Sequence, residues 1–267
     1  QLVNALTKVA YQLRVSVLEM IYRAQCGHPG GSLSASEIIA VLYYHTLRID
    51  PSDPAWPDRD RFVLSKGHAA PVLYAALADL GFFPKEELSS LRQIDSILQG
   101  HPDMIKTPGI DMSTGSLGQG LSAAIGMALA GRLDGKDYHV WTLLGDGELN
   151  EGQVWEAAAF ASFHKLSNLT AIVDVNCVQL DGPTECVLCM EPLADKWKAF
   201  GWNVIEVDGH SVRELLEIVD MVTKRRRELP DESRPTVILA RTVKGKGVSF
   251  MENQASWHGA VPNIHEF

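Results

Sequence analysis

Two oxygen-bearing side chains, thirty positions apart, have the chemistry to hold a magnesium ion. Asp146 stands between Gly145 and Gly147, and Asn176 follows thirty positions later. A carboxylate and an amide oxygen are hard donors suited to Mg²⁺, whose octahedral shell is then completed by phosphate oxygens and water. Gly147 has no side chain, so a phosphate group can approach its backbone N–H. These residue types indicate a metal and diphosphate site if the fold brings them together.

The segments around Asp146 and Asn176 predict that the fold brings the two side chains together. Patterns of buried strands occupy residues 140–144 and 169–173, and an Ala-rich helical pattern at 154–163 lies between them. If the two strands are neighbours in a parallel sheet, their carboxyl ends lie roughly 4.8 Å apart at the same edge. Open α/β sheets bind ligands at that edge. The helix that follows Gly147 would add its positive N-terminal end.

Strand and helix patterns alternate along the rest of the chain. Gly and Pro in Cys26–Gly31 predict a loop there, and Ser34–Glu37 resembles a capping box that opens a helix. The alternation predicts one α/β domain over residues 1–267, with a parallel sheet, helices on both faces and Pro230–Pro235 as a polar connector. Further strands are expected at 62–64, 202–207 and 236–240, and further helices at 3–24, 192–200 and 212–227. An Ala/Leu-rich helix is also expected after His68, ending at Gly81.

Composition excludes several classes of protein. With 267 residues, 46% of them hydrophobic and 21% charged, the chain is typical of a globular protein. A net charge of −9 argues against a general nucleic-acid surface, and neither a membrane-spanning apolar run nor a signal-peptide pattern is present. Cys186 and Cys189 have no second pair at zinc spacing, so we expect packing or surface thiols in a reduced, cytoplasmic enzyme.

Several motifs in order carry a resemblance to a known family. The segment Gly145–Asn176 resembles the thiamine diphosphate motif, and Glu151-Gly152 and Trp155–Ala158 within it resemble transketolase in particular. The resemblance covers nearly the whole chain and implies the diphosphate-binding domain of the thiamine diphosphate fold. The other segments similar to transketolase motifs are Gly27–Gly30, Leu64–Ala69, Gly100–Pro102, Ser113–Gly120 and Trp257–Gly259.

The resemblance implies roles for four histidines that lie beside Gly or Pro. His28 and His258 would contact the donor substrate and assist proton transfer at its oxygens, and His101 would hold substrate hydroxyls. His68 would contact the cofactor diphosphate, and His258 would also lie near it. Histidine suits this work because it donates, accepts and exchanges protons near neutral pH.

The family pattern also implies further cofactor contacts. Gly115, Ser116 and Leu117 would meet the cofactor rings, and the backbone carbonyl of Val178 would be a third metal ligand beside Asp146 and Asn176. The expected cofactors are thiamine diphosphate and Mg²⁺, for which Ca²⁺ or Mn²⁺ could substitute. Lys66 and Ser116 stand at positions that we expect to vary among transketolases.

The implied activity is transfer of a two-carbon ketol group between sugar phosphates, as in the pentose phosphate pathway. The glutamate that activates the cofactor belongs, in this family, to a pyrimidine-binding domain that residues 1–267 do not resemble. We therefore expect half of a split transketolase, joined by a C-terminal subunit in an α₂β₂ heterotetramer, or a fragment of a longer protein. The alternatives are the α subunit of a 2-oxo acid dehydrogenase, a synthase condensing pyruvate with a triose phosphate, and a non-catalytic partner.

Overall fold

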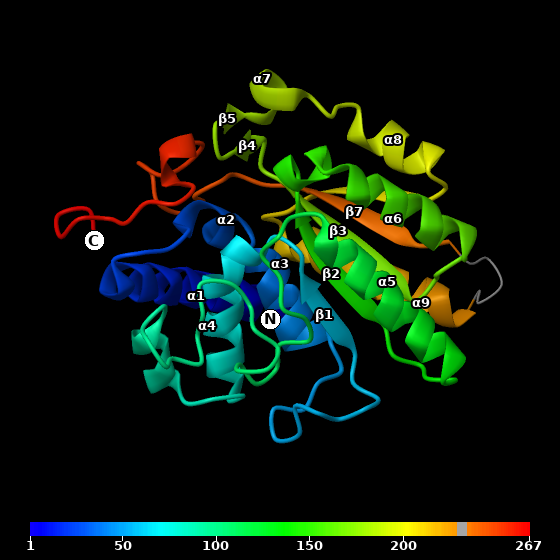
Figure 1. Ribbon diagram of the computed structural model, residues 1–267, viewed down its shortest axis with the longest axis horizontal. Coiled ribbons are helices and arrows are strands. Elements are labelled where there is room, and N and C mark those ends of the chain that lie inside the picture. Colours follow the sequence, from blue (N-terminus) through cyan, green and yellow to red (C-terminus); the bar gives the residue numbers. More distant parts are fainter. Residues whose placement is uncertain (229–233) are drawn as a thin grey trace.

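A parallel sheet of five strands lies at the centre of the molecule, in the order β1-β2-β3-β7-β6 (Figure 1). The structure is a computed structural model that describes residues 1–228 and 234–267. All five predicted strands are confirmed, whereas most of the predicted connector, residues 230–233, lies outside the described residues. The strands are β1 (Arg61–Leu64), β2 (Val140–Gly145), β3 (Leu169–Val175), β6 (Asn203–Asp208) and β7 (Thr236–Arg241).

Helices cover both faces of this sheet, so the predicted fold class is confirmed. Successive side chains of a strand point to opposite faces, and in β2 Trp141 and Leu143 join one core while Val140 and Leu144 join the other. The first core is covered by α1 (Leu2–Ala24), α3 (Ser36–Val41), α4 (Ala70–Leu80) and α9 (Val212–Glu228). The second is covered by α5 (Gln119–Leu133), α6 (Gly152–Phe163) and α8 (Leu193–Ala199).

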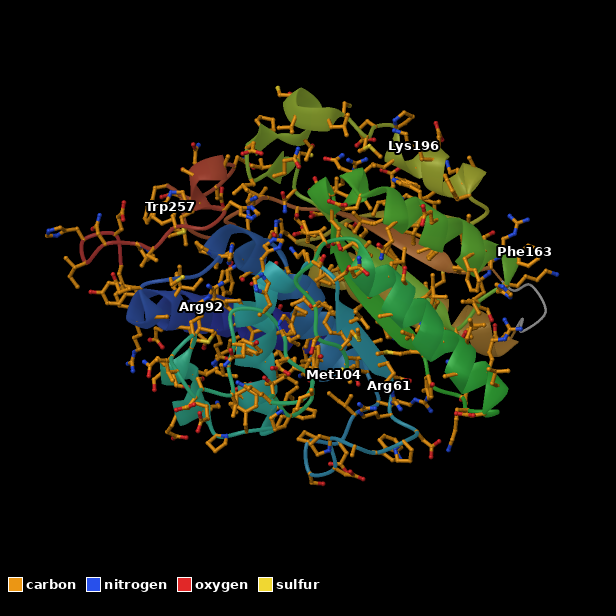
Figure 2. All side chains as sticks on the ribbon, viewed as in Figure 1. Arg61, Arg92, Met104, Phe163, Lys196 and Trp257 are labelled. Atoms are coloured by element: carbon orange, nitrogen blue, oxygen red, sulfur yellow. The ribbon has the colours of Figure 1, made fainter. Side chains whose placement is uncertain are left out.

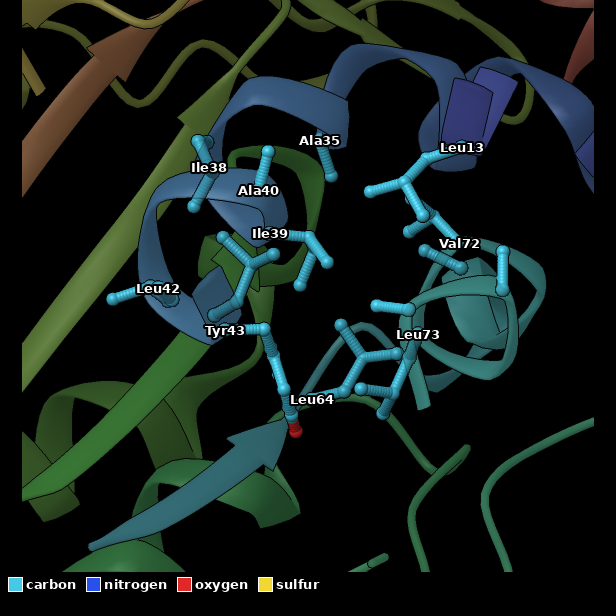
Figure 3. Close-up of a cluster of buried hydrophobic side chains, with 14 of the residues drawn as sticks. Leu13, Ala35, Ile38, Ile39, Ala40, Leu42, Tyr43, Leu64, Val72 and Leu73 are labelled. Carbon is cyan, nitrogen blue, oxygen red and sulfur yellow. The ribbon is translucent and has the colours of Figure 1, made fainter. Parts of the chain in front are cut away.

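The first core fixes the N-terminal helices against the sheet. Figure 3 shows Leu13 of α1, Ile39 of α3 and Leu73 of α4 converging beside Leu64 at the end of β1. All four side chains are almost completely buried. Each such side chain stabilises the fold by about 1.5–3 kcal/mol relative to an exposed one. This packing therefore holds the loops that follow β1 and α1 in a defined place.

The predicted loop at Cys26–Gly31 is wrong in its second half. A short helix, α2, spans Pro29–Ser34. Proline is compatible with a helix here because it occupies the first turn, where its missing N–H would have no partner anyway. The glycines of this helix serve close packing, since a Cβ on Gly30 would lie 2.9 Å from the carbonyl oxygen of Trp257.

The predicted capping box at Ser34–Glu37 is also wrong. The helix α3 begins at Ser36, and no side chain caps it. The Ser34 hydroxyl donates instead to Asp174 at 2.6 Å, and Glu37 accepts from Arg14 at 2.6 Å. Buried tertiary partners for both side chains have replaced the local hydrogen bonds that the pattern predicts.

Shorter elements join the main ones. A π-helical turn, η1 (Leu42–Thr46), extends α3, and a small hairpin follows the third strand. Sequence patterns did not predict that hairpin, which consists of β4 (Val178–Gln179) and β5 (Gly182–Pro183). The remaining short elements are η2 (Gly67–Ala69), η3 (Lys85–Ser90), η4 (Gly147–Asn150), α7 (Thr184–Leu188) and η5 (Ala255–Trp257).

Two predictions from composition can be compared with the structure. Among the described residues, no helix is both long enough and apolar enough to span a membrane. The four cysteines, which all lie in the described ranges, are exposed and form no disulfide. The prediction of surface thiols at Cys186 and Cys189 is therefore confirmed.

Candidate cofactor site

All five parallel strands end at one edge of the sheet, and the loops after four of them, β1, β2, β3 and β7, line a cavity of about 150 Å³. The strands β2 and β3 are direct neighbours, because Gly145 pairs with Asp174 in parallel register. Asp146 and Asn176 therefore leave adjacent strands, as predicted. The cavity is lined by Gly31, Lys66, His68, Leu117, Gly145, Asp146, Gly147, Glu148, Asn176, Val178, Gln179, Leu180, Lys244 and His258.

Asp146 is held rigidly at the end of β2. One carboxylate oxygen accepts from the backbone N–H of Gly147 at 2.8 Å, and the other accepts from that of Cys177 at 2.6 Å. Burial, and then the charge of Asp174, raise the pKa of Asp146 to about 6 despite these hydrogen bonds. The Gly147 N–H is thus directed at Asp146, and a Cβ on Gly147 would lie 2.8 Å from the Cβ of Gln179.

Asn176 and Val178 present neutral oxygens to the same cavity. The Asn176 amide nitrogen donates to Asp174 at 3.1 Å, which orients the amide so that its oxygen accepts from the Val178 N–H at 3.1 Å. The Val178 carbonyl oxygen accepts from the ammonium group of Lys244 at 2.8 Å. Each of these oxygens has further lone pairs. Asp146, Asn176 and Val178 thus form a group of oxygen donors from two neighbouring loops.

Asp174 connects these loops to the rest of the site, and sequence reasoning missed it. Its side chain is completely buried, and it accepts hydrogen bonds from Ser34, Lys66, Asn176 and Thr242. Burial alone would raise its pKa, but the Lys66 charge and these hydrogen bonds outweigh burial and lower it. A charged residue within the apolar strand 169–175 was the signal that could have revealed it.

Two buried lysines lie beside the cavity. Lys66, which was expected to be a variable position, is 1% exposed and donates to the Gly31 carbonyl at 2.8 Å as well as to Asp174. Lys244, which was not singled out, is 2% exposed and donates to Val178 and to His258 at 2.9 Å. Burial, and then the charge of Lys66, lower the pKa of Lys244 to about 8. Each lysine lies shortly after the end of a strand and directly before a glycine, and this pattern is the sequence feature that could have indicated both lysines as site residues.

The four predicted histidines come together although 230 positions separate the first from the last. The ring centroid of His28 lies 5.6 Å from that of His68, 5.6 Å from that of His258 and 6.1 Å from that of His101. The rings of His68 and His258 stack at 4.9 Å. His68 and His258 line the cavity, and His28 and His101 extend the cluster outward from it.

All four rings favour the neutral form. Burial is the main cause in each case, and nearby cations add to it. The pKa of His28 is lowered to about 4, with Arg92 as the next contributor, and that of His258 to about 3, with Lys244 next. The pKa values of His68 and His101 are lowered as well.

The predicted glycine loop connects the cluster to the sheet. A Cβ on Gly115 would lie 2.9 Å from the His101 ring, and this residue has a φ of 143°, which favours glycine. Leu117 reaches the cavity, whereas the Ser116 side chain is exposed. Buried Glu148, which was not predicted, anchors this loop by accepting from the Gly118 N–H at 2.8 Å.

A family comparison identifies this arrangement. A sequence profile of the family described as "Transketolase, thiamine diphosphate binding domain" matches residues 6–266. The chain belongs to the transketolase family. The match favours a transketolase over the 2-oxo acid dehydrogenase alternative, and the predicted thiamine diphosphate-binding fold is that of the matched domain.

Individual transketolase relatives differ in how much of their length the chain spans. The 6-deoxy-6-sulfo-D-fructose transketolase subunit SqwG of Clostridium sp. (strain MSTE9) is 48% identical over 246 residues, which are 92% of this chain and 87% of that protein. An apulose-4-phosphate transketolase subunit from Phocaeicola vulgatus is 41% identical over 95% of this chain and 88% of that protein.

Comparison with the crystal structure of a transketolase confirms the fold. The crystal structure of the Campylobacter jejuni enzyme matches with a TM-score of 0.90 and 33% identity, over 98% of this chain and 41% of that one. The chain thus spans about two fifths of that transketolase and most of the two proteins that are named as subunits.

Proposed function

We propose that this chain binds thiamine diphosphate together with Mg²⁺ and, with a second chain, transfers a two-carbon ketol group from a ketose phosphate to an aldose phosphate. The observation that carries the proposal is the cluster of four loop histidines, two of which, His68 and His258, line the same cavity as Asp146 and Asn176. A diphosphate site alone would not need this cluster, whereas a reaction on polyhydroxylated substrates does.

The donor set supports a magnesium ion. In the described part of the chain, no three His, Cys, Asp or Glu side chains are grouped to bind a metal by themselves. The proposed ligands are instead the carboxylate of Asp146, the amide oxygen of Asn176 and the carbonyl oxygen of Val178. Mg²⁺ is commonly held by one or two carboxylates and completed by phosphate oxygens and water. Ca²⁺ or Mn²⁺ would serve with the same donors.

The cations around the cavity support an anionic ligand. Lys244 donates hydrogen bonds to a carbonyl and to an imidazole, which are both neutral groups. A buried cation with only neutral partners is costly, and a diphosphate would compensate its charge. We assign the diphosphate to the space between Lys244, His68 and the Gly147 turn. Leu117 would contact the cofactor rings, beside Gly115 and Ser116.

The histidines would act on the substrate. When bound, thiamine diphosphate supplies the carbon nucleophile that takes up and releases the two-carbon unit. His28 and His258 would hydrogen-bond the donor oxygens where charge changes, and His101 would orient the substrate hydroxyls. Partial burial of the cluster limits the access of water to these hydrogen bonds and strengthens them.

A second chain completes the proposed enzyme. Relatives that this chain spans almost completely are named as transketolase subunits, which supports a partner that carries the pyrimidine-binding domain and the activating glutamate. We propose an α₂β₂ heterotetramer. The names of these relatives refer to a sulfosugar and to apulose 4-phosphate, so the donor sugar of this chain is to be found by comparing such donors with xylulose 5-phosphate.

The test is reconstitution with the co-purifying partner. The mixture, with thiamine diphosphate and Mg²⁺, should transfer ketol units from at least one of these donors, and each chain alone should not. His28→Gln should abolish most of the transfer, whereas replacement of the exposed His265 should not. Calorimetry separates the alternatives: absence of cofactor binding by the mixture would favour a non-catalytic partner, and turnover of pyruvate instead of sugars would favour another thiamine enzyme.

A further inference from the structure

Two histidines of the cluster each have a cation against their Nδ1 atom. A guanidinium nitrogen of Arg92 lies 3.4 Å from Nδ1 of His28, and the ammonium nitrogen of Lys244 lies 2.9 Å from Nδ1 of His258. Arg92, labelled in Figure 2, follows the turn η3, and Lys244 follows strand β7. The two pairs thus come from separate parts of the chain.

Arg92 is positioned for this contact by its surroundings. It adopts a left-handed backbone conformation with a φ of 61°, which is uncommon for a residue with a side chain. Its guanidinium also donates to the Gly100 carbonyl at 3.4 Å and to the Cys26 sulfur at 3.3 Å. A Cβ on Gly100 would lie 2.7 Å from the guanidinium carbon, so the absence of a side chain at Gly100 leaves room for the guanidinium in this position. All the hydrogen-bond partners found for Arg92 in the described residues are neutral.

The chemistry of these cations determines where the imidazole hydrogen resides. Guanidinium and ammonium groups donate hydrogen bonds and cannot accept them. A ring nitrogen that faces either group must therefore present a lone pair. In a neutral imidazole the hydrogen then resides on the other nitrogen, Nε2. We propose that Arg92 and Lys244 are positioning residues that hold His28 and His258 as neutral rings with the hydrogen on Nε2.

This arrangement places the hydrogen of each ring on Nε2, the nitrogen that does not contact the cation. The Nε2 edge of His28 lies against the loop of His258, because a Cβ on Gly259 would be 3.6 Å from that Nε2. His258 itself lines the cavity. A neutral ring with hydrogen on Nε2 donates a hydrogen bond to an oxygen that gains negative charge, and it has no lone pair there to remove a proton. The lowered pKa values of both rings agree with this role.

The role in catalysis rests on the proposed function, whereas the position of the hydrogen does not. It follows that His28 and His258 stabilise developing charge as hydrogen-bond donors, and that proton removal falls to other groups. Partners that orient metal-ligating histidines typically change activity by roughly 10- to 100-fold when they are replaced, and we expect an effect of similar size here. Arg92 is the better residue to test, because Lys244 also bonds the Val178 carbonyl in the proposed metal site.

The decisive measurement is the ¹⁵N spectrum of the histidine rings in the labelled full-length chain near neutral pH. His28, identified by its loss in His28→Gln, should show an unprotonated Nδ1 and a protonated Nε2, and so should His258. In Arg92→Met, His28 should change to a mixture of both tautomers, and Arg92→Lys should keep most of the original form. Arg132→Met is the matched control, because Arg132 donates to backbone carbonyls outside the site.

Kinetics of the reconstituted enzyme provide the second readout. Arg92→Met should lower kcat by roughly tenfold with a smaller change in KM, and Arg92→Lys should recover part of the loss. A protonated Nδ1 in the unsubstituted chain, or an unchanged His28 tautomer in folded Arg92→Met, would overturn the proposal. Correct tautomers without ketol transfer by the reconstituted enzyme would refute the proposed function and leave the positions of the hydrogens established.

Discussion

At the scale of single residues, the site is organised by buried charges as much as by its histidines. Asp174 does not line the cavity, yet it bonds the side chains of Lys66, Ser34, Asn176 and Thr242, which come from four separate segments. An ion pair that is buried this completely is costly to break, because each partner would leave a charge without compensation.

Replacement of Lys66 by Met is therefore expected to destabilise the chain by about 3–5 kcal/mol, measured by urea unfolding. Adding Asp174→Asn to Lys66→Met should recover part of the loss, because the carboxylate charge is then removed as well. Lys85→Met is the control, since its pair with Asp79 is largely exposed and contributes at most about 1 kcal/mol. Equal effects of the buried and exposed substitutions would contradict this account.

Asp146→Asn tests the proposed metal ligand. The change keeps the shape of the side chain but removes the charge that Mg²⁺ needs, so Mg²⁺-dependent affinity for thiamine diphosphate should fall by about 100-fold or more. The folded chain without metal should lose about 1–3 kcal/mol of stability, because the Asn amide nitrogen replaces one of the two oxygens that accept from the Gly147 and Cys177 N–H groups. Calorimetry and melting curves with and without Mg²⁺ separate the two effects; Asp134→Asn, on the exposed end of α5, is the control.

At the scale of elements, the helix α5 positions the preceding loop, which holds Gly115, because the helix packs closely against the end of β1 at Gly120. A Cβ on Gly120 would lie 2.6 Å from the Cα of Ser65, the residue that follows β1. Gly126 belongs to the same helix, but nothing lies within 4 Å of the position of its Cβ. The first glycine is required by packing within the chain, and the second is not.

Two alanine substitutions in this helix should therefore have opposite signs. Gly120→Ala should destabilise the chain by about 1–3 kcal/mol through overpacking and displace the loop that holds Gly115. Gly126→Ala should stabilise the isolated chain by about 0.5–1 kcal/mol, because alanine loses less backbone entropy in a helix. Urea unfolding of the two variants measures both values, and destabilisation by Gly126→Ala would show that this position is packed.

At the scale of the whole molecule, the parallel sheet gathers charged and ionisable groups at one edge. Burial favours the neutral form of His28, His68, His101 and His258 in the folded chain, with lowered pKa values. Unfolding restores their ordinary pKa, near 6.5. At these histidines the unfolded chain therefore binds more protons than the folded chain below that pH, so their contribution lowers the free energy of unfolding as pH falls from about 6.5 toward 4.

The pH dependence of unfolding should show this contribution. His28→Gln should make the decrease shallower by about one proton, since the pKa of His28 is lowered to about 4. Asp146, whose pKa is raised to about 6, works in the opposite direction in both proteins, so the difference between them isolates the histidine. Urea midpoints between about pH 7 and pH 4 give the slopes. Parallel slopes would refute the contribution of His28.

The amino-acid sequence by itself determined the strands, the alternation with helices and the positions of Asp146, Asn176 and the four loop histidines. These features follow from apolar periodicity and from motifs that are contiguous in the chain. It did not indicate that Ser34 and Glu37 bond distant partners, nor that Lys66, Asp174 and Lys244 are buried together. Only the tertiary structure decided those points, because the hydrogen bonds and ion pairs of these residues join segments that local pattern does not relate.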